Sequence, residues 1–283
     1  MNGNNMQSRR EFLRSTLAAT AGATLAMRMD MLAAQARTPI LRAQRLAWAG
    51  IRLQLDSGSL FLDPLINRDV WGSALKDELV PVAGAAGDRF ALVTHRHPDH
   101  CDPEAIRQAL GESGTLAYAA QTGIPNVPGV KMRAAQLYEP LLLGDFTATP
   151  VPAVDGYGDP QVSWIVSAGG RRIIHCGDTL WHGSWWHIGR QYGPFDAAFL
   201  PINGAKFSWR KPVTEVAAVM TAEQAVAAAV VIGARLVVPI HYGVSGAEGY
   251  EEDARAEEEL LHFGRKRHIA VEVLKPGAWV AWA

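Results

Sequence analysis

Short apolar runs alternate with longer amphipathic segments along most of the chain, and they predict a succession of strands. Strands are expected at residues 46–55, 59–63, 90–94, 161–168, 171–176, 236–240, 269–274 and 279–282. The turn Asp56-Ser57-Gly58 joins the first two strands, and Gly169-Gly170 closes a hairpin between the fourth and fifth. The other apolar segments are longer and have helical character.

Three helices are predicted, at residues 103–110, 221–233 and 251–263. Asp102 is a good N-cap for the first helix, and Pro103 suits its first turn. Thr221 and Gln224 form a capping-box pattern at the start of the second. Gly264 is expected to close the third. Strands followed by helices, in two halves and without an internal repeat, indicate a layered α/β protein with sheets inside helices.

Composition narrows the class of protein. The chain has 283 residues, of which 48% are hydrophobic and 19% charged, so it can bury a sizeable core. This composition excludes a disordered, collagen-like or coiled-coil protein. A net charge of -1 gives no electrostatic case for nucleic acid. After the first residues, no apolar run reaches the length of a membrane span.

The first 36 residues have the pattern of an export signal. Residues 8–14 contain the pair Arg9-Arg10 followed by Phe12 and Leu13, and a small apolar stretch and the cleavage pattern Ala34-Gln35-Ala36 come next. This resembles a twin-arginine signal peptide, which crosses the membrane with an already folded protein. The alternatives are an amphipathic helix with two chance arginines, or a retained anchor, which the charged Arg28 disfavours.

The resemblance implies a division into residues 1–36, a signal peptide, and residues 37–283, a single domain. The twin-arginine export machinery is then a partner, and the destination is the periplasm or the cell exterior. No stable membrane span remains after cleavage.

The strongest chemical signal is the segment Thr94-His95-Arg96-His97-Pro98-Asp99-His100, directly after a predicted buried strand. Three imidazoles and a carboxylate in one short loop can wrap a cation, because His nitrogen and Asp oxygen are ligands that zinc and related ions prefer. The alternative is a polar loop whose histidines only form hydrogen bonds. The spacing H-x-H-x-D-H favours a metal site.

This loop resembles the hallmark of the metallo-β-lactamase superfamily, and the resemblance extends over most of residues 45–283. The accompanying motifs are Asp63-Pro64, Gly177-Asp178-Thr179 and Pro239-Ile240-His241-Tyr242-Gly243. Motifs at residues 151–153, 188–189 and 192–196 are similar to the branch that includes ascorbate-phosphate lactonases and N-acyl phosphatidylethanolamine phospholipase D. The implied fold is an α/β four-layer αββα sandwich with metals at one edge between the sheets.

Carried over position by position, the resemblance implies two metal sites. His95 and His97 would hold the first metal, and Asp178 would bridge to the second. The remaining ligands of the second metal would be Asp99, His100 and His241. Two zinc ions are expected, with manganese or iron as the alternatives.

Asp155 stands where the family expects a third histidine on the first metal. Three interpretations remain open at this stage. Asp155 can be a carboxylate ligand, the first site can be weak or empty, or His182 or His187 can reach in. A carboxylate here lowers the positive charge of the centre, and oxygen ligation favours manganese or iron more than histidine does.

The expected function is an exported metal-dependent hydrolase that uses a metal-bound hydroxide on a small-molecule ester, lactone or phosphodiester. Asp99 and Asp178 would be catalytic, orienting the nucleophile or carrying a proton, and Thr94 is expected to hold an imidazole. Because Asp155 lowers the charge, we expect a neutral ester, lactone or amide to be preferred over a phosphodiester. The alternatives are a true β-lactamase and a metal-poor binding protein of the same fold.

Two further features leave alternatives open. The aromatic segment at residues 181–187 can pack between a loop and a helix, or it can form a substrate wall that Phe207 and Trp209 join. Cys101 and Cys176 are interpreted as core-filling thiols, and a disulfide between them is the alternative.

Overall fold

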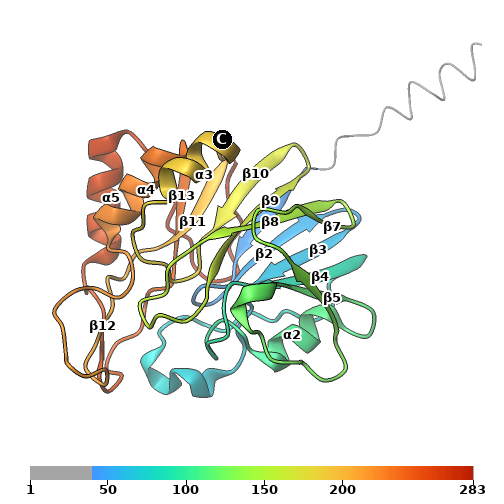
Figure 1. The fold of residues 1–283 in the computed structure, drawn as a ribbon, viewed down its shortest axis with the longest axis horizontal. Helices are drawn as coiled ribbons and strands as arrows, with labels where there is room; N and C mark the ends of the chain where they lie inside the picture. Colours follow the sequence, from blue (N-terminus) through green and yellow to red (C-terminus); the bar gives the residue numbers. More distant parts are fainter. Residues whose placement is uncertain (1–39, 283) are drawn as a thin grey trace, which may run out of the picture. The chain divides into compact units, whose positions relative to one another are not determined.

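Two mixed β-sheets pack face to face at the centre of the fold (Figure 1). The structure, a computed structural model, describes residues 40–282, so the predicted signal peptide lies outside the described residues. The first sheet has the order β1-β2-β3-β4-β5-β6. Its strands are β1 (Arg42–Arg45), β2 (Ile51–Leu55), β3 (Gly58–Leu62), β4 (Asp88–Val93), β5 (Thr115–Ala119) and β6 (Lys131–Ala135).

The second sheet has the order β15-β13-β11-β10-β9-β8-β7. Its strands are β7 (Leu141–Leu143), β8 (Phe146–Pro152), β9 (Val162–Ala168), β10 (Arg171–His175), β11 (Ala197–Pro201), β13 (Leu236–Ile240) and β15 (Ala270–Val271). A separate two-stranded sheet pairs β12 (Lys206–Phe207) with β14 (Tyr250–Glu251).

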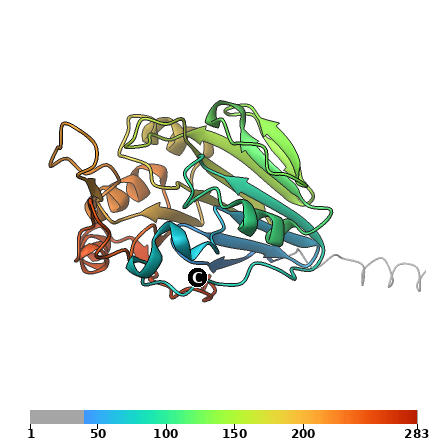
Figure 2. The ribbon, with the colours of Figure 1, turned by 90° about the horizontal axis from the view of Figure 1, so that it is seen from below.

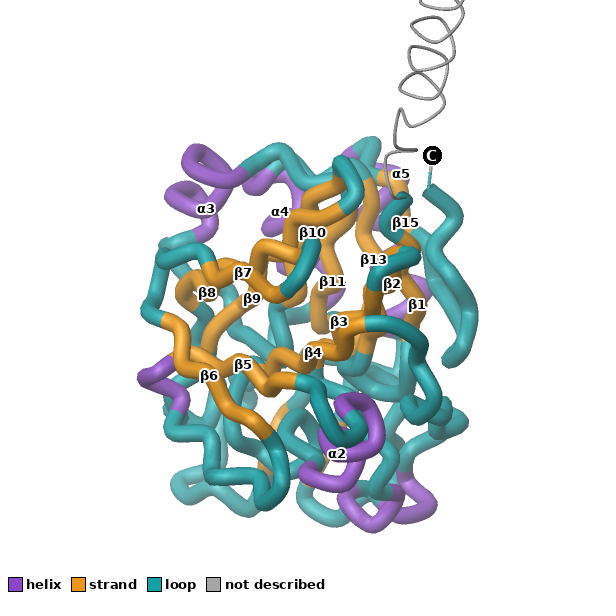
Figure 3. Tube along the Cα trace, turned by 90° about the vertical axis from the view of Figure 1, so that its right-hand side faces the viewer, coloured by secondary structure: helices purple, strands orange, loops and turns teal. Residues whose placement is uncertain are grey.

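Helices cover the outer face of each sheet, which makes four layers (Figure 3). The α-helices are α2 (Pro103–Leu110), α3 (Trp185–Tyr192), α4 (Ala222–Ile232) and α5 (Ala256–Arg267), and the 3₁₀ helices are η1 (Arg68–Val70), η2 (Gly72–Ala74) and η3 (Ala120–Thr122). Helix α2 packs on the first sheet, and α3, α4 and α5 pack on the second. The predicted αββα sandwich is therefore confirmed.

Alternating side chains explain why both faces of each sheet are buried. In β3, Leu60 and Leu62 face the core between the sheets, whereas Phe61 faces the cluster under α2. In β10, Ile173 faces the central core and Ile174 faces the cluster under α3 and α4. Since successive side chains of a strand point to opposite faces, continuous apolar runs are required in strands that lie between two layers.

The strand directions bring several loops to one edge of the sandwich. Strand β4 runs parallel to β3, and β11 runs parallel to both β10 and β13. Strand β8 has the direction of β10, because β9 pairs antiparallel with both. Ligands of α/β proteins bind outside the carboxyl ends of such strands. The loops that follow β3, β4, β8, β10, β11 and β13 are therefore the place to look for a site.

Several local predictions are confirmed. The hairpin β9–β10 turns at Gly169 and Gly170, whose φ angles of 53° and 72° suit a two-residue turn. The Asp102 carboxylate caps α2 by accepting from the backbone N–H groups of residues 104 and 105. The capping box of Thr221 and Gln224 is present at the start of α4. Within residues 40–282, no helix is long and apolar enough to span a membrane.

Other local predictions are wrong. Residues 46–55 are not one strand, because a turn at residues 46–50, with Trp48 at φ 57°, separates β1 from β2. Helix α5 spans Ala256–Arg267, so it starts later than expected and continues past Gly264. A Cβ on Gly264 would lie 2.6 Å from Val271 Cγ2, so this glycine serves close packing against β15 and does not end the helix.

The C-terminal strands are also shorter than predicted. Among the described strands, β15 lies at the edge of its sheet and pairs with β13 alone, and the pairing covers two residues. Residues 279–282 form no strand, and Trp279 makes a single bridge to Gln44. Val280 packs into the central core, so apolar character here reflects burial rather than a ladder. The loop after β12 projects from one end of the molecule (Figures 1 and 2).

Candidate metal centre

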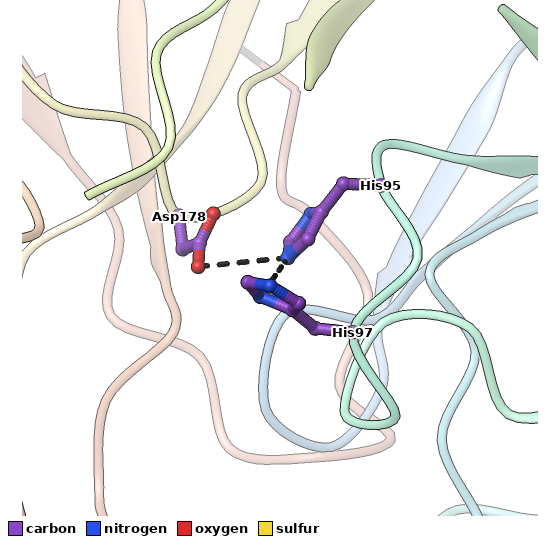
Figure 4. Close-up of side chains that lie close together, drawn as sticks. All are labelled: His95, His97 and Asp178. Carbon is purple, nitrogen blue, oxygen red and sulfur yellow. Dashed lines mark hydrogen bonds and ion pairs between the residues drawn. The ribbon is translucent and has the colours of Figure 1, made fainter. Parts of the chain in front are cut away.

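The loop after β4 and the loop after β10 bring His95, His97 and Asp178 together (Figure 4). His95 Nε2 lies 2.8 Å from His97 Nδ1 and 3.7 Å from Asp178 Oδ2. The ligand atoms of the three residues lie within 4.8 Å of one another. The side chains expected for the first metal, and the expected bridge, therefore share one pocket.

A second group consists of Asp99, His100 and His241. Asp99 Oδ2 lies 3.8 Å from His100 Nε2 and 4.0 Å from His241 Nε2. Asp178 Oδ2 is 4.0 Å from His100 Nε2 and 3.9 Å from His241 Nε2. Asp178 thus lies beside both groups, where a bridging carboxylate has to stand.

Asp155 approaches the first group from the side of His97. Its Oδ2 lies 3.5 Å from His97 Nε2, and its Oδ1 accepts a hydrogen bond from Tyr157 N at 2.6 Å. With His97 and Asp159, Asp155 forms a third group of potential ligands. It does not belong to the compact trio of His95, His97 and Asp178, so its role as a ligand stays a prediction.

His182 and His187 do not take the place of the missing histidine. The His182 ring stacks on Trp185 at 4.4 Å between centroids, and its Nδ1 accepts from Ser184 N. His187 is exposed and contacts Tyr138. Neither residue belongs to the potential ligand groups of the described chain. The interpretation that one of them reaches the metal is not supported, because His182 packs on Trp185 and His187 is exposed on α3.

Asp159 is a residue of the site that the sequence did not reveal. Its Oδ2 accepts from His97 Nε2 at 2.9 Å, and its Oδ1 accepts from the Arg96 guanidinium at 2.7 Å. With Nε2 carrying the proton, His97 directs the lone pair of Nδ1 toward His95 Nε2. A carboxylate 62 residues further along the chain, inside a Gly- and Pro-containing loop, carries no signal of this pairing.

Asp63 and Thr94 hold the deeper imidazoles. Asp63 Oδ2 lies 2.8 Å from His100 Nδ1 and accepts from Thr94 Oγ1 at 2.7 Å. Thr94 Oγ1 lies 3.0 Å from His95 Nδ1. Both imidazoles therefore have Nδ1 engaged in hydrogen bonds, and Nε2 is directed toward the centre. The prediction that Thr94 orients an imidazole is confirmed.

Trp48 and Asn203 hold the remaining ligands, and the sequence pointed to neither. Trp48 Nε1 donates to Asp99 Oδ2 at 3.1 Å, and the Trp48 ring lies 4.1 Å from the His241 ring. Asn203 Nδ2 lies 3.2 Å from His241 Nδ1. Asp99 and His241 are thus fixed by groups from the β1–β2 turn and the loop after β11.

The centre has the unsatisfied atoms that a cation would satisfy. Among the described residues, His100 Nε2, Asp155 Oδ2 and Asp178 Oδ1 are buried and have no hydrogen-bond partner. His95 Nε2 and His97 Nδ1 face each other at 2.8 Å, although His95 Nδ1 already pairs with Thr94 Oγ1 and His97 Nε2 with Asp159 Oδ2. Buried polar atoms without partners are costly, so this donor set fits divalent cations.

Electrostatics agree with that fit. Burial holds the pKa of His95 and of His241 well below the usual range, so both imidazoles are neutral ligands. Burial also lowers the pKa of His100, but the carboxylates, Asp99 first, outweigh it and raise the pKa to about 10. Burial, followed by the charge of Asp178, raises the pKa of Asp155 to about 6. The raised pKa reflects the crowding of negatively charged carboxylates. A bound cation would offset this charge in the same way as a proton does.

A cavity of about 380 Å³ opens beside both ligand groups. Its ligand side consists of His97, Asp99, Asp178 and His241. The aromatic part of the lining, called the aromatic wall below, consists of Trp71, Tyr157, Phe207, Trp209 and Tyr250. Phe207 and Trp209 belong to a wall, as one interpretation of the sequence expected.

The segment at residues 181–187 does not belong to this wall. Trp185 is fully buried in the cluster under the second sheet, and Trp186 is 53% exposed on α3. The alternative interpretation, packing between a loop and a helix, is the correct one for these residues. Cys101 and Cys176 are free and buried, as expected of core-filling thiols.

Comparisons with known proteins identify the family of this chain. Residues 60–242 match the family model described as the beta-lactamase superfamily domain. A UPF0173 metal-dependent hydrolase of Rubrobacter xylanophilus is 32% identical over 205 residues, which is 66% of this chain and 76% of the relative.

Two solved structures share the fold. Igni18, a metallo hydrolase of Ignicoccus hospitalis, has a TM-score of 0.62 and 21% identity, covering 85% of this chain and 97% of that one. CmlA, a diiron β-hydroxylase of Streptomyces venezuelae, has a TM-score of 0.63 and 14% identity, covering 86% and 54%. At these identities the two structures support the fold alone. From the family match and the curated relative, the chain belongs to the metallo-β-lactamase superfamily and is a metal-dependent hydrolase of that fold.

Proposed function

We propose that this hydrolase cleaves a small, neutral ester, lactone or amide at a centre of two divalent metals. The observation that carries the proposal is the charge of the cavity. Among the described residues that line it, Asp99 and Asp178 are acidic and none is a lysine or arginine. A phosphodiester carries a negative charge and is favoured by Arg or Lys clamps.

Asp155 adds to that argument. Its buried carboxylate lies 3.5 Å from His97, in a position where the family pattern has a neutral histidine. An additional negative charge offsets part of the positive charge of two cations, so attraction for an anionic substrate falls. A lactonase-like activity therefore fits this chain better than the phospholipase-like activity of the same branch.

Asp99 and Asp178 have separate roles in the proposed reaction. Divalent cations bound there would supply a nucleophilic water at neutral pH and polarise the substrate carbonyl. Asp99, held by the Trp48 indole at 3.1 Å, can accept a proton from the nucleophile and pass it to the leaving oxygen. Asp178 has one buried oxygen without a partner, so it can bind metal and orient the nucleophile.

The identity of the metals is part of the proposal. Histidines dominate the donor set, which favours zinc, and we propose two zinc ions. The carboxylates Asp155 and Asp178 near the first group are ligands that manganese and iron also accept. CmlA is a diiron protein with a similar fold, which makes iron the main alternative.

The experiment measures metal content and hydrolysis together, on the parent protein and on Asp155→Ala and His97→Ala. We expect two metals per chain in the parent and about one in Asp155→Ala. We also expect faster turnover of lactones than of bis(4-nitrophenyl) phosphate, and loss of turnover in His97→Ala. Faster phosphodiester turnover would contradict the substrate class. Absence of metal and of hydrolysis in the parent would favour a metal-poor binding protein.

We further propose that residues 1–36 export the folded enzyme by the twin-arginine route to the periplasm or cell exterior. The support is the Arg9-Arg10 pair with its apolar stretch and cleavage pattern. Replacing both arginines with lysine should retain the protein in the cytoplasm. Export of the double variant at the parent's level would contradict this route.

A further inference from the structure

A continuous row of aromatic and histidine rings lies along one side of the metal centre. Successive ring centroids lie 4.1–5.6 Å apart in the order His241, Trp48, Trp71, Tyr250, Phe207, Tyr157 and His97. The line therefore starts at a ligand of the second group and ends at a ligand of the first. Aromatic packing at these distances is favourable and holds each ring in place.

Three rings of the aromatic wall, those of Phe207, Trp209 and Tyr250, are close to parallel, whereas the Tyr157 ring is tilted by 42° from that of Phe207. The interplanar angles are 14° between Trp209 and Tyr250, 19° between Phe207 and Trp209, and 29° between Tyr157 and Trp209. A cage for a quaternary ammonium group presents ring faces from several directions. Near-parallel rings form a stack instead, and a flat ring extends a stack better than a rounded group does.

The backbone sets this stack in place. Phe207 and Tyr250 are paired residues of β12 and β14, so their side chains lie side by side. Ser208 N donates to Gly249 O at 2.9 Å, and a Cβ on Gly249 would lie 2.6 Å from Trp209 Cε3. Gly249 therefore lets Trp209 lie close to the backbone of the neighbouring strand.

The outer edge of the wall is also supported. The Arg210 guanidinium lies 4.1 Å from the Tyr157 ring and donates to Tyr157 O at 2.9 Å. Trp209 is 45% exposed although its ring contacts those of Phe207 and Tyr250. A large exposed indole places apolar surface in contact with water, which is unfavourable. Such surface beside a metal centre is typical of a binding site.

The size of the cavity limits the substrate. About 380 Å³ is near the lower end for small-molecule sites, and the rings of the wall line this cavity together with His97, Asp99 and Asp178. A molecule that fills it has its reactive carbonyl at the ligands and its remaining part against the rings. There is room for one small ring system rather than for a large lipid.

We propose that the aromatic wall binds a flat aromatic or unsaturated ring attached to the ester or lactone that the centre cleaves. This inference rests on the proposed hydrolysis of a neutral carbonyl substrate. It adds the chemical class of the group beside the carbonyl. Phe207, Trp209 and Tyr157 are then the residues that determine specificity.

The test compares two substrates that differ in the flatness of one ring. γ-Phenyl-γ-butyrolactone and γ-cyclohexyl-γ-butyrolactone share the lactone and have similar bulk. For the zinc-loaded full-length protein, we expect KM to be about fivefold lower for the phenyl compound, with similar kcat, which is the range of one aromatic stacking contact. Equal KM values, or a preference for cyclohexyl, would overturn the proposal.

Variants test whether the aromatic wall causes the preference for the phenyl compound. Phe207→Leu keeps an apolar side chain but removes a flat ring, so the ratio of the two KM values should fall toward one. Trp186→Leu is the matched control, because this exposed aromatic residue lies on α3 outside the cavity. A ratio that Phe207→Leu leaves unchanged, or that Trp186→Leu lowers equally, contradicts the assignment.

A binding measurement separates this proposal from the proposed function. The matching γ-phenyl and γ-cyclohexyl lactams bind without the rapid ring opening of lactones, and calorimetry measures their affinities. Tighter binding of the phenyl lactam, with no lactone hydrolysed, would support ring binding by the aromatic wall and contradict the proposed hydrolysis. Lactone hydrolysis with equal affinities for the two lactams would support the proposed hydrolysis and contradict ring binding by the aromatic wall.

Discussion

The centre contains two carboxylate–histidine pairs that differ in their surroundings. Asp63 holds His100 at 2.8 Å, and both side chains are fully buried. Asp159 holds His97 at 2.9 Å, but these side chains are 25% and 21% exposed. Arg96 neutralises Asp159 from the solvent side, whereas Asp63 receives its further hydrogen bonds from Thr94.

The difference shows how one centre combines a rigid half with an adaptable half. An interaction in a buried, low-dielectric environment is strong and expensive to lose, whereas an exposed pair is screened by water and salt. We therefore expect the second group, behind Asp63, to tolerate changes less well than the first. The first group, beside Asp159, is where Asp155 replaces the expected histidine.

The largest effect on metal binding and hydrolysis is expected for Asp178, which lies beside both ligand groups. Asp178→Ala removes the carboxylate that lies within about 4 Å of ligands from each group, so we expect loss of both metals. Hydrolysis should fall at least about 100-fold, because metals contribute several kcal/mol of transition-state stabilisation. Metal analysis and lactone kinetics measure this. Asp145→Ala, at an exposed turn position, is the control, and two retained metals in Asp178→Ala would contradict the bridge.

The buried pair should come next. Asp63→Asn keeps the size of the side chain but weakens its hold on His100 and Thr94, so affinity of the second group for zinc should fall about 10- to 100-fold. Zinc titration against a competing chelator measures this change. Asp56→Asn, exposed in the β2–β3 turn, is the control and should keep the parent's affinity. An Asp63→Asn protein with parental affinity would show that burial alone orients His100.

The exposed pair should give the smallest effect. Asp159→Asn should lower the affinity of the first group about tenfold or less, since its pair with His97 is partly solvated. Raising the salt concentration to 1 M should narrow the difference from the parent, because the Debye length falls to about 3 Å. The same titration at two salt concentrations tests this. Glu104→Gln, which breaks an exposed ion pair on α2, is the control.

A larger loss in Asp159→Asn than in Asp63→Asn would reverse the comparison between the two halves. A salt effect of equal size on both variants would show that exposure does not separate them. The first result would place the rigid part of the centre at the loop of residues 155–159, and the second would remove the distinction between the two pairs.

Local sequence signals predicted much of the fold and most of the site. Capping residues, glycine turns and apolar runs depend on neighbouring positions, so α2, α4, β13 and the β9–β10 hairpin were predicted closely. The α5 boundaries were not, because Gly264 is explained by contact with Val271 of another element. A glycine has the same letter whether it ends a helix or permits close packing.

The sequence by itself determined the H-x-H-x-D-H loop as a candidate metal site, and its resemblance to the metallo-β-lactamase superfamily added Asp155, Asp178 and His241 as predicted ligands. The tertiary structure alone decided which groups hold those ligands and what faces them. Asp159, Trp48 and Asn203 reach their partners across long separations in the chain. The aromatic wall likewise unites β12 with β14 and the loop at residue 157. Such contacts depend on strand order and packing, which hydrophobic periodicity does not encode.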